Sequence, residues 1–163
     1  MKWNYILIPL IVIAVSFIGG YFTNLGMGWY GSIRLPDWIP SGGIIGIIWT
    51  VIFILSAISV LIVWNFTQHD NLFRRIMFLF AINGLINISW SFVFFYLHKM
   101  GWAILVAALL EVSVLAIIYL IRVLGVVQKS ELVKGTYMLL LPYAGWVIFA
   151  TYLTYTVWSL NRI

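Results

Sequence analysis

The sequence predicts an all-α integral membrane protein in which five transmembrane helices form one bundle. Of its 163 residues, 64% are hydrophobic and only 8% are charged, and its mean hydropathy is +1.11. A water-soluble domain of this size needs far more polar surface than this composition supplies. Five apolar runs are also long enough to cross a hydrocarbon core of about 30 Å as helices. The excess apolar surface is therefore expected to face a lipid bilayer.

The expected spans follow one another with short connections. They cover residues 5–23, 43–65, 75–97, 102–124 and 137–160. The first run is interpreted as a retained helix, because it is long for a signal peptide and lacks a small-residue cleavage site. The connections leave no room for a soluble module, so we expect a single domain over residues 1–163.

Breaking residues mark the connections. The longest connection is expected at residues 26–43, where Gly26, Gly28, Gly31, Pro36, Pro40, Gly42 and Gly43 favour a structured loop over a continuing helix. The connection at 98–101 is so short that the third and fourth spans must be antiparallel neighbours. Near the connection at 125–135, Ser130 is placed to cap the start of a helix.

The distribution of lysine and arginine predicts the orientation in the membrane. One side of the bilayer collects Lys2, Arg74, Arg75, Arg122, Lys129 and Lys134, and the other side collects Arg34, Lys99 and Arg162. Positively charged connections tend to stay in the cytoplasm. We therefore predict a protein of the bacterial cell membrane with a cytoplasmic N-terminus. Basic residues at span ends anchor helices, so the net charge of +5 does not indicate nucleic acid as a partner.

The composition also limits the chemistry. The chain has no cysteine, and its two histidines and four acids are scattered, so we expect no disulfide, no metal site and no cofactor. No acid–base or nucleophile–base pair supports ordinary catalysis, which makes an enzyme the less favoured class. Glu111 is the only acid near the middle of a span. Helix-to-helix hydrogen bonding is the favoured interpretation of this residue, and a role in transport or proton relay is the alternative.

The third span carries two amides followed by two aromatic rings on one face. Asn83 and Asn87 lie four residues apart, and Trp90 and Phe94 continue their face at helical spacing. Polar groups inside spans usually face the interior of the bundle. One interpretation is that the amides hold helices together and the tryptophan simply packs. The other is that this face lines a binding site.

Two further spans offer matching faces. Trp49 and Phe53 lie four residues apart on the second span, and Trp146, Ala150 and Leu153 share a face of the fifth. Because Trp49 and Trp146 lie inside their spans, a place in the interfacial aromatic belt explains them less well than a place in the interior. We predict that the three helices converge on one aromatic pocket.

Three stretches resemble a known family. Residues 29–40, WYGSIRLPDWIP, resemble the WYxxLxKPxWxPP signature of the tryptophan-rich sensory protein and translocator protein family (TspO/MBR), also called the peripheral-type benzodiazepine receptor family. Residues 87–103 are similar to its NxxW, FF and GWA pattern, and residues 141–153 to its LPYxxWxxFATxL stretch. The similarity runs in order from Trp29 to Asn161.

The resemblance implies a five-helix bundle, often a homodimer, with a pocket beneath the first loop for porphyrins and for isoquinoline and benzodiazepine-type ligands. Matching positions place Trp49, Asn87, Trp90, Trp146 and Ala150 at the pocket, with Tyr30 and Trp38 in the loop that covers it. Animal members also bind cholesterol, but Ser159 stands where the family's motif has its basic residue, so cholesterol is not predicted here.

The leading hypothesis is a membrane receptor or carrier for tetrapyrroles such as protoporphyrin. Its candidate ligand-binding residues are Tyr30, Trp38, Trp49, Phe53, Asn83, Asn87, Trp90, Phe94, Trp146 and Ala150. One alternative is a catalyst of light- or oxidant-dependent porphyrin breakdown with Trp49 and Trp146 as redox-active groups. Another is a structural or regulatory partner of a second membrane protein that binds no ligand.

Overall fold

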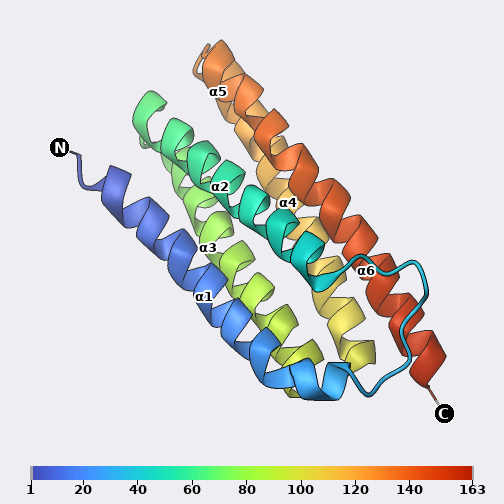
Figure 1. Ribbon diagram of the computed structural model, residues 1–163. Coiled ribbons are helices and arrows are strands. Elements are labelled where there is room, and N and C mark those ends of the chain that lie inside the picture. Colours follow the sequence, from blue (N-terminus) through green and yellow to red (C-terminus); the bar gives the residue numbers. More distant parts are fainter. Residues whose placement is uncertain (1, 163) are drawn as a thin grey trace.

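The computed structural model describes residues 2–162, and within that range it is helical with no β-strand. Figure 1 shows the helices side by side in one bundle, with the two termini at opposite ends. The elements are α1 (Asn4–Tyr30), α2 (Gly42–Phe66), α3 (Asn71–Ser91), η1 (Phe92–Tyr96), α4 (Met100–Val127), α5 (Glu131–Gly135), η2 (Thr136–Leu140) and α6 (Leu141–Asn161). The segment η1 continues α3, while α5 and η2 lead into α6.

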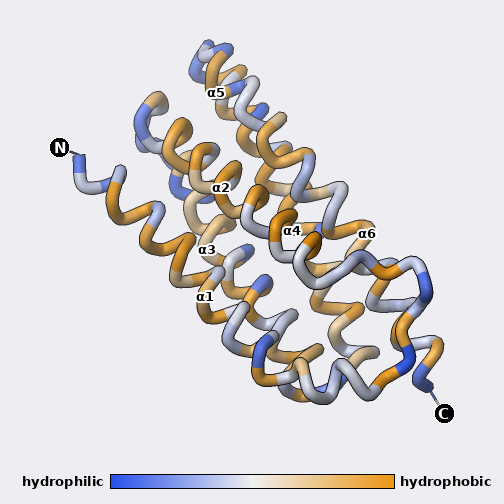
Figure 2. Tube along the Cα trace, viewed as in Figure 1, coloured by the Kyte–Doolittle hydropathy of each residue, from blue (hydrophilic) through white to orange (hydrophobic). Residues whose placement is uncertain are grey.

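Five spans of 25 to 31 residues are long and apolar enough to cross a membrane. About 20 apolar helical residues suffice for that crossing. Figure 2 shows hydrophobic colours along most of the bundle and hydrophilic colours mainly toward its two ends, as a bilayer around the middle and water at both ends require. The prediction of an all-α integral membrane protein with five transmembrane helices is confirmed.

The two halves of the bundle differ in packing. In the half that holds α5, Val63 of α2, Ile76 of α3, Ile121 of α4 and Val133 of α5 are fully buried in one apolar cluster. The cluster in the half near the 31–41 loop centres on Phe94 and Phe95 and includes three further aromatic side chains. The first half is therefore packed mainly by aliphatic side chains, and the second half holds more aromatic ones.

The loop predicted at residues 26–43 is shorter than expected, because α1 continues as a helix to Tyr30. Gly26 lies inside α1, where a Cβ atom would stand only 2.3 Å from the carbonyl oxygen of Phe95. This glycine allows α1 and η1 to approach closely and does not form a turn. The predicted start of the loop at Gly26 was therefore wrong. The non-helical loop covers residues 31–41.

The 31–41 loop is held against α6. The Arg34 backbone N–H donates to Asn161 Oδ1 at 2.9 Å, and Asn161 Nδ2 donates to the Arg34 carbonyl at 2.8 Å. Ser41 then caps α2 by accepting a hydrogen bond from the Ile44 N–H at 3.4 Å. Figure 1 shows the loop passing α6 on its way from α1 to the start of α2.

The third span ends in a π-helical segment. In η1 the hydrogen bond from Leu97 N–H reaches back five residues to the Phe92 carbonyl, at 2.9 Å. The turn that follows contains His98 at φ 57°, and its ring stacks on Trp29 with 4.2 Å between ring centroids. A π-helical segment widens the turn, and such segments occur frequently at functional sites. Here it carries Phe94 and Phe95, both buried.

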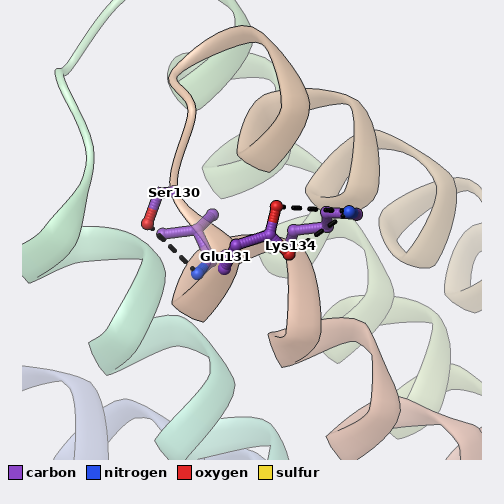
Figure 3. Close-up of polar contacts among 4 residues, drawn as sticks. Ser130, Glu131 and Lys134 are labelled. Carbon is purple, nitrogen blue, oxygen red and sulfur yellow. Dashed lines mark hydrogen bonds and ion pairs between the residues drawn. The ribbon is translucent and has the colours of Figure 1, made fainter.

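Side chains cap the helices at the other end of the bundle. Ser130 Oγ accepts a hydrogen bond from the Val133 N–H at 3.3 Å, which confirms the predicted cap, and Lys134 pairs with Glu131 at 3.2 Å (Figure 3). Asp70 caps α3 by accepting from the Phe73 N–H at 2.8 Å, and this bond holds the pKa of the Asp70 carboxyl below its usual range. Both caps satisfy backbone donors at helix starts.

The close approach at Gly26 yields a stability prediction. We expect Gly26→Ala to destabilise the protein by about 1–3 kcal/mol, because the added methyl group overlaps the Phe95 backbone. Gly28→Ala is the matched control on the same helix, since a Cβ there meets nothing within 4 Å; it should leave stability unchanged or raised. Helical circular dichroism during heating in detergent measures both. Equal melting temperatures for the two variants would contradict the assigned role of Gly26.

Candidate ligand-binding site

A cavity of about 480 Å³ lies between α1, α2, η1 with the end of α3, and α6. Its walls carry seven large aromatic side chains together with small and uncharged polar ones. The aromatic members are Tyr30, Trp49, Phe53, Trp90, Phe94, Phe95 and Trp146. Concave, mostly apolar spaces of this size are typical of small-molecule sites.

Eight of the ten predicted site residues line this one cavity. They are Tyr30, Trp49, Phe53, Asn87, Trp90, Phe94, Trp146 and Ala150. The second, third and fifth spans therefore converge on an aromatic pocket, as their helical faces indicated. That these side chains contact a ligand stays a prediction.

Trp38 does not line the cavity, although the resemblance placed it in a covering loop. Its ring stacks on Tyr152 of α6 with 5.7 Å between centroids and an interplanar angle of 15°. It also meets Phe149 edge-on at 6.0 Å, and Phe149 in turn lies 5.2 Å from Trp146. Trp38 thus packs on Phe149 and Tyr152 of α6 and does not line the cavity, whereas Trp146 of the same helix does.

Asn83 does not line the cavity either, because it belongs to a buried hydrogen-bond network. Asn83 Nδ2 donates to Ser113 Oγ of α4 at 2.8 Å, and the Tyr143 hydroxyl of α6 donates to Asn83 Oδ1 at 3.0 Å. Asn87 Nδ2 donates to the same hydroxyl at 3.4 Å. The network joins α3, α4 and α6 inside the bundle. For Asn83 these bonds fit the interpretation of an amide that holds helices together, whereas Asn87 both joins the network and lines the cavity.

The aromatic walls are themselves packed in pairs. Trp90 stacks on Phe94 with 5.4 Å between centroids and 10° between planes. Trp49 lies 5.7 Å from Phe53 and meets the Tyr143 ring edge-on at 6.0 Å. Contacts of this kind fix ring orientation. The cavity therefore presents preformed flat faces.

Two donors in the walls have no partner in the protein. The Nε1 atoms of Trp90 and Trp146 are buried, and neither makes a hydrogen bond. An unpaired buried donor costs about 1–3 kcal/mol, and because neither atom has accessible surface, both lie beneath the cavity surface. Asp, Glu, Lys, Arg and His side chains are absent from the described residues that line the cavity. The site thus favours a largely apolar molecule.

Sequence reasoning missed the first span as a wall of the site. Small and polar residues of α1 line the cavity, among them Gly19, Thr23 and Asn24. At Gly19 a Cβ would lie 3.6 Å from Ser91 Oγ, and the Thr23 hydroxyl bonds back to the Gly19 carbonyl at 3.0 Å. The available signal was the group of small and polar side chains in the second half of an otherwise apolar helix.

Glu111 lies away from the cavity. Both of its carboxyl oxygens are buried without a hydrogen-bond partner, so the expected helix-to-helix hydrogen bond is absent. The side chain faces a shallow groove between α4 and α6 that Ile104, Thr151 and Tyr155 also line. Glu111 therefore takes no part in the candidate site.

The network around Tyr143 yields a second stability prediction. We expect Tyr143→Phe to lower the free energy of unfolding by about 1 kcal/mol, because it removes the donor to Asn83 and the acceptor for Asn87. Tyr119→Phe is the control, since Tyr119 is 66% exposed on α4. Unfolding by increasing SDS in mixed micelles measures both variants. An equal loss in the control would show that the network contributes nothing of its own.

Comparison with known proteins agrees with this architecture. The profile of the TspO/MBR family matches residues 6–159. The chain is 30% identical to tryptophan-rich protein TspO of Bacillus cereus over 99% of both chains. It is 35% identical to the membrane protein YtaB of Bacillus subtilis over 93% of this chain and 92% of that one. It is 27% identical to the human translocator protein over 90% and 83% of the two chains. The match over nearly the whole chain shows that this five-helix membrane protein belongs to the TspO/MBR family.

Proposed function

We propose that this protein is a membrane receptor or carrier that binds a tetrapyrrole such as protoporphyrin in the cavity between α1, α2, η1 and α6. The observation that carries the proposal is the gathering of seven aromatic side chains around one cavity of about 480 Å³. A tetrapyrrole is a flat conjugated ring system. Its apolar aromatic surface complements this lining.

Stacking supplies the larger part of the expected affinity. Trp49, Trp90 and Trp146 come from three different helices, so one macrocycle contacts several of the walls. Aromatic pairs contribute about 0.5–1.5 kcal/mol each beyond the area that they bury. Asn87, which also lines the cavity, adds a polar contact.

The alternatives fare differently. A catalyst of porphyrin breakdown would use the same cavity, in which Trp49 and Trp146 both lie, but the absence of ionisable acid–base pairs from the described lining gives no support to ordinary catalysis. A structural partner without a ligand would not need an open space of about 480 Å³. A role as carrier is in keeping with the name of the human relative, translocator protein.

We also propose that the N-terminus is cytoplasmic and that the membrane is the bacterial cell membrane. Figure 1 places the N-terminus, the connection from α2 to α3 and the start of α5 at one end of the bundle. Six of the lysines and arginines belong to that end: Lys2, Arg74, Arg75, Arg122, Lys129 and Lys134. Their excess favours the cytoplasm. The cavity, in the half nearer the 31–41 loop, would then lie toward the outer face.

Replacing either tryptophan tests the binding proposal. We expect Trp90→Phe and Trp146→Phe each to weaken protoporphyrin binding about three- to tenfold, because each removes part of the aromatic surface that lines the cavity. Trp102→Phe is the matched control, since Trp102 is 66% exposed and lies outside the cavity. Fluorescence titration of the purified protein with protoporphyrin measures all three. Absence of binding to the unaltered protein at micromolar ligand would overturn the proposal.

Single cysteines test the proposed orientation, because the natural chain has none. Asp37→Cys lies in the 31–41 loop and Asn71→Cys at the start of α3, both at exposed positions. In intact bacterial cells a membrane-impermeant maleimide should label Asp37→Cys alone, and Asn71→Cys should react only after permeabilisation. The opposite labelling pattern would reverse the orientation.

A further inference from the structure

The candidate cavity reaches the surface of the bundle between α1 and α2. Gly20 and Asn24 of α1 line it, as do Gly46 and Thr50 of α2, and all four residues are exposed. Ile47, the neighbour of Gly46, is 67% exposed. The edges of the cavity wall on these two helices are therefore also part of the outer surface of the protein.

The two helices do not touch at this level. A Cβ atom added at Gly20 or at Gly46 would meet no heavy atom of another element within 4 Å in the described part of the chain. Gly19 and Gly26 of α1 behave differently, because an added Cβ would lie 3.6 Å from Ser91 Oγ or overlap the backbone of η1. The side of α1 that faces α3 and η1 is thus packed, whereas an opening lies between α1 and α2.

The opening lies at the depth of the hydrocarbon core. Since α1 spans Asn4–Tyr30 and α2 spans Gly42–Phe66, Asn24 and Gly46 stand about 10–12 Å from the middle of their helices at 1.5 Å per residue. Half of a hydrocarbon core is about 15 Å thick. The helix middles lie near the middle of the bilayer, so acyl chains and not water surround the opening.

The end of the cavity toward the 31–41 loop is covered. Tyr30 packs on Phe95 with 5.4 Å between ring centroids, and apolar side chains of the loop join the same cluster. Two hydrogen bonds between Arg34 and Asn161 hold the loop on α6. A molecule arriving from water would have to displace these contacts, whereas a molecule arriving from lipid would not.

From these observations we propose that ligands enter and leave the cavity sideways from the bilayer, through the opening between α1 and α2, and not past the 31–41 loop. This route admits aromatic molecules that partition into hydrocarbon and excludes strictly water-soluble ones. Its use by a tetrapyrrole rests on the function proposed above, but the route itself does not.

A thiol inside the cavity tests the route without any tetrapyrrole. Ala150→Cys places the thiol in the α6 wall of a chain that has no natural cysteine. Permeable proteoliposomes receive N-(1-pyrenyl)maleimide, which dissolves in the bilayer, or a sulfonated maleimide, which stays in water. Each labelling rate is divided by the rate for the same protein unfolded in SDS. We expect the pyrenyl reagent to be at least about tenfold faster, because a sulfonate does not enter hydrocarbon.

Further changes in the Ala150→Cys protein separate the two routes. Gly46→Phe narrows the opening from α2 and should slow pyrenyl labelling about tenfold, since a packed ring has to be displaced; Gly20→Phe should do the same from α1. Gly43→Phe is the matched control, because Gly43 is exposed on α2 with open space around it but does not line the cavity. This control should leave the rate unchanged.

Releasing the loop provides the opposite test. Asn161→Ala removes both hydrogen bonds to Arg34 and should leave pyrenyl labelling unchanged. Faster labelling in this variant, equal rates in Gly46→Phe and Gly43→Phe, equal normalised rates for the two maleimides, or no labelling before unfolding would each overturn the route. Failure of the unaltered protein to bind protoporphyrin would overturn the proposed function alone.

Discussion

The hydroxyl of Tyr143 joins Asn83 and Asn87 inside the bundle, and the arrangement of the site depends on this contact. Its distances to the Asn83 and Asn87 side chains are 3.0 Å and 3.4 Å. In hydrocarbon a polar side chain has no water to bond, so three such groups are stabilised by finding one another. The network fixes α6 against α3, and Asn83 extends it to α4. Because Asn87 also lines the candidate cavity, the same interaction holds one side chain of its wall in place.

Close backbone contact shapes the other end of the site. Gly26 of α1 lets the chain approach Phe95 so closely that no side chain fits between them. The approach occurs at η1, where the π-helical turn carries Phe94 and Phe95. Phe94 then stacks on Trp90 and meets Trp29 and Tyr30 edge-on. The half of the bundle near the 31–41 loop is thus held by ring contacts around the candidate cavity, whereas the core of the half near α5 consists mainly of aliphatic side chains.

The sequence predicted the helical class and most of the cavity wall because both follow from periodicity. Trp49, Asn87 and Trp146 each lie on a helical face that a single span reveals, and all three line the cavity. Features that depend on contacts between spans were not predictable in the same way. The α1 wall was not predicted, because its small residues can be recognised as cavity lining only once the position of α3 beside them is known. Trp38 was misplaced because its ring finds Tyr152 of α6, a contact that no local pattern in the loop encodes. The predicted start of the loop at Gly26 was wrong for a related reason. A glycine that lets a neighbouring helix approach cannot be told from a glycine in a turn by sequence alone.

We propose that the aromatic walls of the cavity form a tetrapyrrole site. A structure of the protein determined with bound protoporphyrin tests this most directly. We expect density for the macrocycle between α1, α2, η1 and α6, in contact with Trp49, Trp90 and Trp146. Density for the ligand only on the lipid-facing surface, with the cavity between those helices empty, would contradict it.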